Sequence, residues 1–188
     1  MNHIIGLDLS LTATGIARFE NGETTFTTLR SNDTGMERLL DIEARVLDCI
    51  YPHCRLVVVE GIAFSRNDPS AQERAALHYF LRRNFFQNSA RYVLVPPSTL
   101  KKFVTGKGTA EKSLVMMEVY KRWRLSAGND NEADAIGLAM IGACLLGEMG
   151  TQNEAQREVL ATISASHPGM FPNIAPAAKK PKKRKKAA

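Results

Sequence analysis

Cysteine is scarce in this sequence, and its three copies form no pattern that would bind a metal or build a disulfide framework. Cys49, Cys54 and Cys144 are odd in number and include no CxxC pair. Such cysteines are typical of buried free thiols in a reducing compartment, so we expect neither a zinc site nor structural disulfides. We therefore expect a cytoplasmic protein.

Long apolar stretches are also missing. No apolar run reaches the roughly 18 residues that a membrane-spanning helix needs. The opening residues, MNHIIGLDLS, lack the basic start of a signal peptide, so we expect neither membrane insertion nor secretion. The chain has 188 residues, of which 44% are apolar and 23% charged. This composition suits one folded domain of ordinary size.

Most of the chain lacks a net positive charge, because the excess is concentrated at the C-terminus. The formal net charge is +6, yet residues 1–178 carry a net charge of −1. A nucleic-acid surface on the body must therefore be a local cluster. We interpret the basic tail as a DNA tether, with a nuclear-localisation signal as the alternative. Its seven positive charges are Lys179, Lys180, Lys182, Lys183, Arg184, Lys185 and Lys186.

The apolar pattern alternates between strand and helix periods over residues 1–150 and predicts an α/β domain with a mixed sheet flanked by helices. A further helix is predicted within 151–166, and the Pro-, Ala- and Lys-rich residues 167–188 are expected to be a disordered basic tail. The predicted strands are 3–10, 14–21, 23–30, 55–60 and 91–97, and the predicted helices are 36–50, 69–88, 98–104, 110–123 and 131–149.

Three acidic residues stand where apolar or strand-end side chains are expected. Asp8 lies between Leu7 and Leu9, Glu60 ends the strand VVVE, and Asp134 lies in an apolar helix. A buried carboxylate is costly unless it is paired, and carboxylates brought together raise one another's pKa unless cations neutralise them. Two Mg²⁺ or Mn²⁺ ions in such a cluster activate water and stabilise a leaving phosphate oxygen. The pattern therefore predicts metal-assisted phosphodiester hydrolysis.

Four segments resemble, in order and spacing, the RuvC-type Holliday-junction resolvases of the RNase H-like nuclease superfamily. They are IIGLDLSLTATGIA, VVVEGIAF, VTGKGTAEKSLV and NEADAIGLAMIGA, and the resemblance spans residues 3 to about 148. It implies an RNase H-like, five-stranded mixed sheet and a crossover junction endodeoxyribonuclease with two Mg²⁺ ions per active site, for which Mn²⁺ can substitute. It implies no nucleotide cofactor.

The resemblance also implies an acidic tetrad. Asp8 would bridge both metal ions, Glu60 would bind the second, and Asp134 would be the last helical ligand. The family's remaining ligand lies three residues before Asp134, where this chain has Asn131. Asparagine offers one neutral oxygen, whereas Asp130 lies a helical turn from Asp134 and can share its face. We predict Asp130 as the substitute, with Asn131 as the alternative.

Glu132 is a poorer candidate for that position, since it stands two residues before Asp134 and points elsewhere. Lys101 and Lys112 match family lysines on either side of the glycine loop, and we predict that they act in catalysis near the scissile phosphate. Residues 98–124 contain seven basic and two acidic residues, which predicts a phosphate-binding face. The candidate DNA-binding residues are Lys101, Lys102, Lys107, Lys112, Arg74, Arg82 and Arg83.

Phe64 follows Glu60 by four residues and is a candidate wedge that unstacks bases at a junction. An ordinary buried phenylalanine is the alternative reading. The histidines show no ligand spacing and receive no role.

We therefore expect an Mg²⁺-dependent, structure-selective endonuclease that resolves four-way DNA junctions in recombination, repair or phage DNA processing. Two symmetric cuts imply a homodimer. One alternative is a nuclease of the same fold that acts on forks, flaps or other branched DNA. The others are an ATP-binding protein related to actin and sugar kinases, since GLDLSLTATGIA resembles their phosphate loop, and an inactive junction-binding protein.

Overall fold

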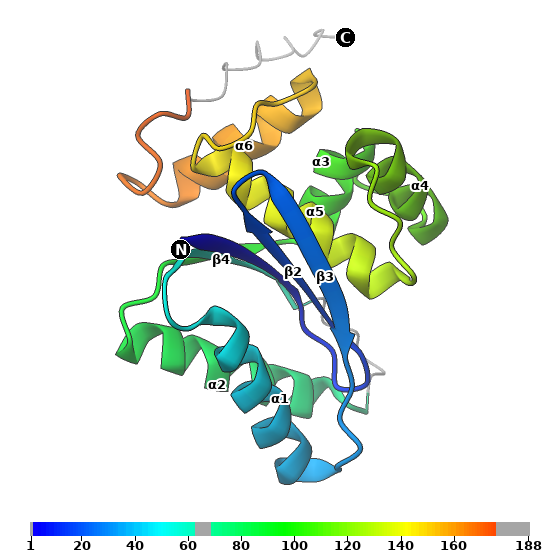
Figure 1. The fold of residues 1–188 in the computed structure, drawn as a ribbon, viewed down its shortest axis with the longest axis vertical. Helices are drawn as coiled ribbons and strands as arrows, with labels where there is room; N and C mark the ends of the chain where they lie inside the picture. Colours follow the sequence, from blue (N-terminus) through cyan, green and yellow to red (C-terminus); the bar gives the residue numbers. More distant parts are fainter. Residues whose placement is uncertain (1, 63–68, 176–188) are drawn as a thin grey trace, which may run out of the picture.

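The computed structural model describes residues 2–62 and 69–175. Five strands form one mixed sheet in the order β3-β2-β1-β4-β5 (Figure 1). Strands β1 to β3 are an antiparallel meander, and β4 and β5 run parallel to β1. The five-stranded mixed sheet predicted from the sequence is therefore confirmed. The strands are β1 His3–Asp8, β2 Thr14–Glu20, β3 Glu23–Leu29, β4 Cys54–Glu60 and β5 Tyr92–Val95.

Helices cover both faces of the sheet, as Figure 1 shows. One face packs against α1 and α2 through a core that includes Ile5, Leu7 and Leu81, and the other packs against α3 to α6 around Ile4 and Ile136. Within residues 2–62 and 69–175, no helix has the length and apolar character that crossing a bilayer requires. The helices are α1 Gly35–Ile50, α2 Ala71–Gln87, α3 Pro97–Thr105, α4 Lys112–Trp123, α5 Asp130–Leu145 and α6 Glu154–Ser166.

Helix α5 lies directly on the central strands because two glycines leave room for its backbone. A β-carbon added to Gly6 in β1 would lie 2.2 Å from the carbonyl oxygen of Ala135. One added to Gly15 in β2 would lie 2.1 Å from the carbonyl oxygen of Asn131. Any side chain at either position would push the helix away. The first turns of α5 are thereby held over the carboxyl end of β1.

The alternation of side chains along β1 decides which layer Asp8 faces. Ile5 and Leu7 point into the core formed with α1 and α2, whereas Ile4 and Gly6 face the layer that contains α5. Successive strand residues point to opposite faces. Asp8 therefore shares the face of Ile4 and Gly6 and points toward α5.

Residues 167–175 correct part of the expected disordered tail. Phe171 is only 4% exposed and packs into the core beneath α6. Arg91, the residue before β5, donates a hydrogen bond of 2.8 Å to the carbonyl of Met170 and lies over the Phe171 ring. Composition predicted disorder because it carries no sign of a contact with a residue 79 positions away. The lysine-rich residues 179–186 lie outside the described residues.

Candidate active site

A cavity of about 280 Å³ opens where the carboxyl ends of β1 and β4 meet the helices. Both helical layers contribute to it, since α2 lines it from one face of the sheet and α3, α4 and α5 from the other. All four predicted acidic residues and three predicted cationic ones line this cavity. They are Asp8, Glu60, Asp130 and Asp134 together with Arg74, Lys101 and Lys112.

The carboxyl groups of Asp8, Glu60 and Asp134 form an electrostatically coupled group. β1 and β4 are parallel neighbours, and Leu7 pairs with Val59, so Asp8 and Glu60 leave the sheet side by side. Burial and the nearby charges of Asp8 and Asp134 raise the pKa of Glu60, which donates a hydrogen bond to Asp8. Burial also raises the pKa of Asp8.

Asp134 reaches the same group from α5. Burial and the charges of Asp8 and Asp130 raise the pKa of the Asp134 carboxyl to about 7. The charge of Lys101 opposes the upward shift in the pKa of both Glu60 and Asp134. Burial and mutual repulsion thus favour the protonated forms of these three carboxyl groups as long as no cation offsets their charge.

Asp130 differs from the other three acids because it has a cationic partner. It forms an ion pair with Lys112 of α4, and this contact lowers the pKa of Asp130 and raises that of Lys112. Lys112 is the first residue of α4 and Asp130 the first of α5. The pair therefore joins the beginnings of two helices at the mouth of the cavity.

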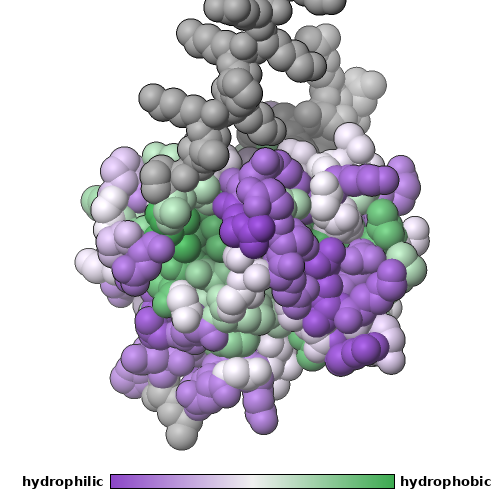
Figure 2. All heavy atoms as spheres, turned by 90° about the horizontal axis from the view of Figure 1, so that it is seen from above, coloured by the Kyte–Doolittle hydropathy of each residue, from purple (hydrophilic) through white to green (hydrophobic). Residues whose placement is uncertain are grey.

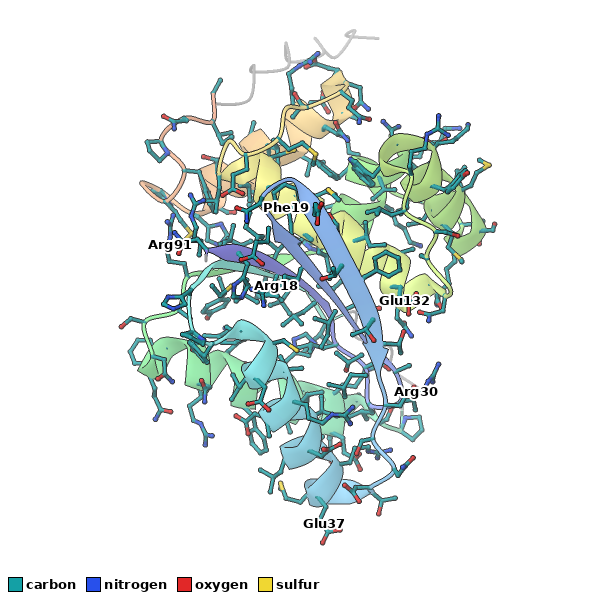
Figure 3. All side chains as sticks on the ribbon, in the orientation of Figure 1. Arg18, Phe19, Arg30, Glu37, Arg91 and Glu132 are labelled. Atoms are coloured by element: carbon teal, nitrogen blue, oxygen red, sulfur yellow. The ribbon has the colours of Figure 1, made fainter. Side chains whose placement is uncertain are left out.

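Asn129 and Glu132, the polar residues near Asp130 in the chain, form hydrogen bonds that hold the start of α5. Asn129 caps α5 by accepting a hydrogen bond of 3.0 Å from the backbone N–H of Glu132. The Glu132 carboxylate accepts a hydrogen bond of 2.9 Å from Thr28, and Glu132 lies beside β3 (Figure 3). It does not line the cavity, whereas Asn131 does. Glu132 therefore ties the start of α5 to the sheet.

The donor set matches a hard divalent cation. The four carboxylates and the amide oxygen of Asn131 line one cavity, and Mg²⁺ prefers oxygen ligands of these kinds. A cation would relieve the repulsion that raises the pKa values of Asp8, Glu60 and Asp134. Across residues 2–62 and 69–175, no three Asp, Glu, His or Cys side chains already form a ready-made metal cluster. The residues that line the cavity therefore fit such an ion in the chemistry of their ligand atoms.

The other predicted DNA-binding residues lie away from the cavity. Lys102 forms an ion pair of 2.5 Å with Glu158 of α6, and Lys107 is exposed in the loop after α3. Arg82 lies over the ring of Tyr79, and Arg83 is 3.6 Å from Glu43. The candidate wedge Phe64 lies outside the described residues.

His78 also lines the cavity, although its place in the sequence gave no sign of a role there. It lies one helical turn after Arg74 on α2, and both side chains line the cavity. Burial and the charges of Arg82 and Arg74 lower the pKa of His78 to about 4. The four-residue spacing between Arg74 and His78 indicates that the two side chains share one face of a helix. Metal-ligand spacing among the histidines does not reveal this relationship.

Comparisons with known proteins agree with this geometry. The family model described as crossover junction endodeoxyribonuclease RuvC matches residues 4–142, and a search of curated proteins gave no match. The Thermus thermophilus RuvC structure is 22% identical over 79% of this chain and 97% of that chain, with a TM-score of 0.60.

Two structures with DNA are also similar. T. thermophilus RuvC in complex with Holliday junction substrate gives 19% identity and a TM-score of 0.63, and the match covers 80% of this chain and 98% of that one. Fowlpox virus resolvase with substrate Holliday junction DNA gives 16% identity and a TM-score of 0.45, covering 73% and 95%. The resemblance seen in the sequence is confirmed: this chain belongs to the RuvC family of crossover junction endodeoxyribonucleases.

Proposed function

We propose that this protein resolves four-way DNA junctions by hydrolysing phosphodiester bonds at the cavity between β1, β4 and α5, with two Mg²⁺ ions or Mn²⁺ in their place. The observation that carries the proposal is the gathering of Asp8, Glu60 and Asp134 in one cavity with Lys101 and Lys112. Membership of the RuvC family, whose nucleases generally depend on divalent metal ions, supports it. The same family match favours a nuclease over an ATP-binding protein.

Asp8, Glu60 and Asp134 are the proposed ligands, and bound metal ions would supply an activated water and charge stabilisation at the leaving oxygen. Asp8 is central to the set because its carboxyl contacts Glu60 and interacts electrostatically with Asp130 and Asp134. Lys101 lies in α3 close enough to influence the pKa of both Glu60 and Asp134. Its ammonium group is therefore placed to hold a phosphate oxygen and to stabilise developing negative charge.

Asp130 is the proposed fourth ligand, and Asn131 remains the alternative. The Asp130 carboxylate interacts with both Asp8 and Asp134, so it is directed toward the acidic group. Its ion pair with Lys112 supplies a cation that can move to a phosphate when a metal ion takes its place. Asn131 lines the cavity as well, but its neutral oxygen neutralises less cationic charge.

The proposed DNA path runs from the cavity over the side of the molecule that carries α3 and α4. Arg74, Lys101 and Lys112 line the cavity, and Lys107 is exposed nearby in the chain between these helices. Viewed from above, hydrophilic side chains gather on the side where α4 lies (Figure 2). Cations along such a path neutralise phosphates without reading sequence.

A homodimer is part of the proposal, because two symmetric cuts need two active sites. Helix α2 carries Tyr79 and Phe86, which are 63% and 84% exposed and lie seven residues apart on one helical face. Large exposed aromatics of this kind are typical of protein interfaces. We propose that this face of α2 contacts a second copy of the chain. Sedimentation equilibrium of Phe86→Ser, which should shift the protein toward monomer, tests this contact.

The direct test is incubation of the full-length protein with four-way, forked and linear duplex DNA, with and without Mg²⁺. Symmetric nicks in the four-way junction that require Mg²⁺ support the proposal. Preferential cutting of the fork would favour a broader branched-DNA nuclease. Binding of the junction with no cutting in Mg²⁺ or Mn²⁺ would instead identify an inactive junction-binding protein.

A further inference from the structure

His78 occupies an unusual position for a buried polar residue. Its side chain is 5% exposed, yet it forms part of the cavity wall on the α2 side. The neighbouring buried residues Leu77 and Leu81 pack into the hydrophobic core between α2 and the sheet. No hydrogen bond joins the His78 imidazole to another residue within the described ranges 2–62 and 69–175. Neither imidazole nitrogen is among the fully buried polar atoms that lack a partner in these ranges, so the polar edge of the ring reaches the cavity and is available to a group that enters it.

The charge state of His78 limits what that partner can be. Because burial and the neighbouring Arg82 and Arg74 lower the pKa of His78 to about 4, its imidazole is neutral near pH 7. A neutral imidazole has one N–H donor and one acceptor nitrogen. The two guanidinium groups favour an anion next to this donor, and they make His78 a poor proton acceptor for activating water.

The residues that line the cavity with His78 give a second, geometric reason to expect an anion beside it. Arg74 and His78 are four residues apart on α2 and line the same cavity. Lys101 and Lys112 line it from α3 and α4, on the other side of the sheet. A DNA strand in the cavity would therefore meet hydrogen-bond donors on two sides, with the acidic residues at the ends of β1 and β4 between them.

We propose that His78 is a positioning residue whose N–H donates a hydrogen bond to a phosphate oxygen of the DNA strand that is cut. This inference rests on the proposed nuclease function and adds to it a residue that neither the family resemblance nor the acidic cluster indicates. Phosphate oxygens only accept hydrogen bonds, which suits a neutral donor beside Arg74. Contact from the α2 side fixes the strand laterally, so that the scissile bond is aligned with the acidic residues.

The test compares His78→Leu, which keeps much of the volume, with His78→Asn, which keeps an N–H donor. Gln72→Leu is the matched control, because Gln72 is exposed on the same helix and lies outside the cavity wall. Single-turnover cleavage of a four-way junction is measured in Mg²⁺, and junction affinity is measured in EDTA. We expect His78→Leu to slow cleavage about 10- to 100-fold, the usual effect of losing a hydrogen bond to a charged group. Affinity should change by less than about threefold, His78→Asn should recover most of the rate, and Gln72→Leu should match the wild type.

The cleavage and melting measurements separate a failure of the inference about His78 from a failure of the proposed nuclease function. If the wild type cuts the junction and His78→Leu cuts equally fast, the inference about His78 is wrong and the nuclease function stands. If both variants lose rate and melting temperature together, His78 is a structural residue and the inference is again wrong. If the wild type does not cut in Mg²⁺ or Mn²⁺, the nuclease function itself fails.

A measurement on the wild type keeps the inference testable when a variant does not fold. The imidazole resonances of the four histidines are recorded by NMR in EDTA before and after addition of the junction. We expect the His78 resonance to shift toward that of a hydrogen-bonded imidazole as the DNA binds. An unchanged His78 signal at saturation would exclude the phosphate contact.

Discussion

Glu60 donates a hydrogen bond to Asp8 across the ends of two neighbouring parallel strands. In the metal-free protein a proton thus holds together two carboxyl groups that would otherwise repel each other. A metal ion bound here would replace that proton, so binding should release protons and depend on pH.

Asp134→Asn should stabilise the metal-free protein at high pH. Burial raises the pKa of Asp134 from 3.8 to about 7, so between these values the folded state holds a proton that the unfolded state has lost. Stability from this proton is complete below pH 3.8 and is lost as the pH rises through about 7. At pH 8 in EDTA the variant should gain about 1–3 kcal/mol, or roughly 3–10 °C in melting temperature.

The decisive measurement is how the difference in melting temperature between the wild type and Asp134→Asn changes with pH. Melting temperatures of the wild type and Asp134→Asn should converge near pH 4, where both side chains are uncharged. The control is Glu23→Gln, which removes an exposed carboxylate from β3 and should leave the curve unchanged. An Asp134→Asn variant less stable than the wild type at pH 8 would contradict the prediction.

Asp8→Asn should abolish cleavage while leaving junction binding intact. The substitution removes the negative charge that interacts with all three other acidic residues, and the cleavage rate in Mg²⁺ should fall by on the order of 1000-fold. Junction affinity in EDTA should stay within a few-fold of the wild type, because the proposed phosphate contacts come from other residues. Cleavage retained by this variant would rule out the proposed mechanism.

Asp130→Ala and Asn131→Ala should separate the two candidates for the fourth ligand. Loss of the Asp130 carboxylate should raise the Mg²⁺ concentration for half-maximal cleavage by about 10-fold or more, whereas Asn131→Ala should raise it less. Both variants are titrated with Mg²⁺ in the cleavage assay and by calorimetry. The opposite ranking would assign the position to Asn131.

Gly15→Ala should damage fold and activity together. A β-carbon here would lie 2.1 Å from the Asn131 carbonyl oxygen, so α5 must move and carry Asp134 with it. We expect a loss of about 3 kcal/mol in the free energy of unfolding, measured by urea denaturation, together with slower cleavage. Gly150→Ala is the control, because a β-carbon there has nothing within 4 Å. Wild-type stability of Gly15→Ala would show that α5 does not depend on this close approach.

Deletion of residues 179–188 should weaken DNA binding and flatten its dependence on salt. The segment carries seven positive charges, and each phosphate that it neutralises adds about 0.9 to the slope of log K against log salt. Junction affinity is measured at several salt concentrations for the full-length and shortened proteins. The same slope for both would exclude the tether, and an unchanged cleavage rate at saturation would show that the active site is unaffected.

The sheet, the helices and the acidic residues could be predicted because their signals are local. A valine-rich run ending in Glu60 and a polar residue inside an apolar helix, Asp134, are visible in short segments. The family resemblance singled out Lys101 and Lys112, and both line the cavity, although their predicted catalytic role stays a prediction. Charge clustering alone did not distinguish Lys101 from Lys102, because the ion pair of Lys102 with Glu158 joins residues 56 positions apart.

The contacts that escaped prediction depend on how distant segments pack. His78 becomes a cavity residue only because of the way that α2 is rotated against the sheet, which depends on Leu77 and Leu81 in the core. Phe171 lies in a stretch whose composition favours disorder, and its burial depends on contacts with other parts of the fold. Neither environment leaves a periodic signal in the sequence.

The contact between Arg91 and Met170 holds Met170 and Phe171 at one end of the sheet. Arg91 precedes β5, whereas the cavity lies beyond the opposite ends of the parallel strands. The hydrophobic core at this far end is therefore closed by a segment that contributes no residue to the cavity wall. Packing at one end of the sheet and charged groups at the other are thus supplied by separate parts of the chain.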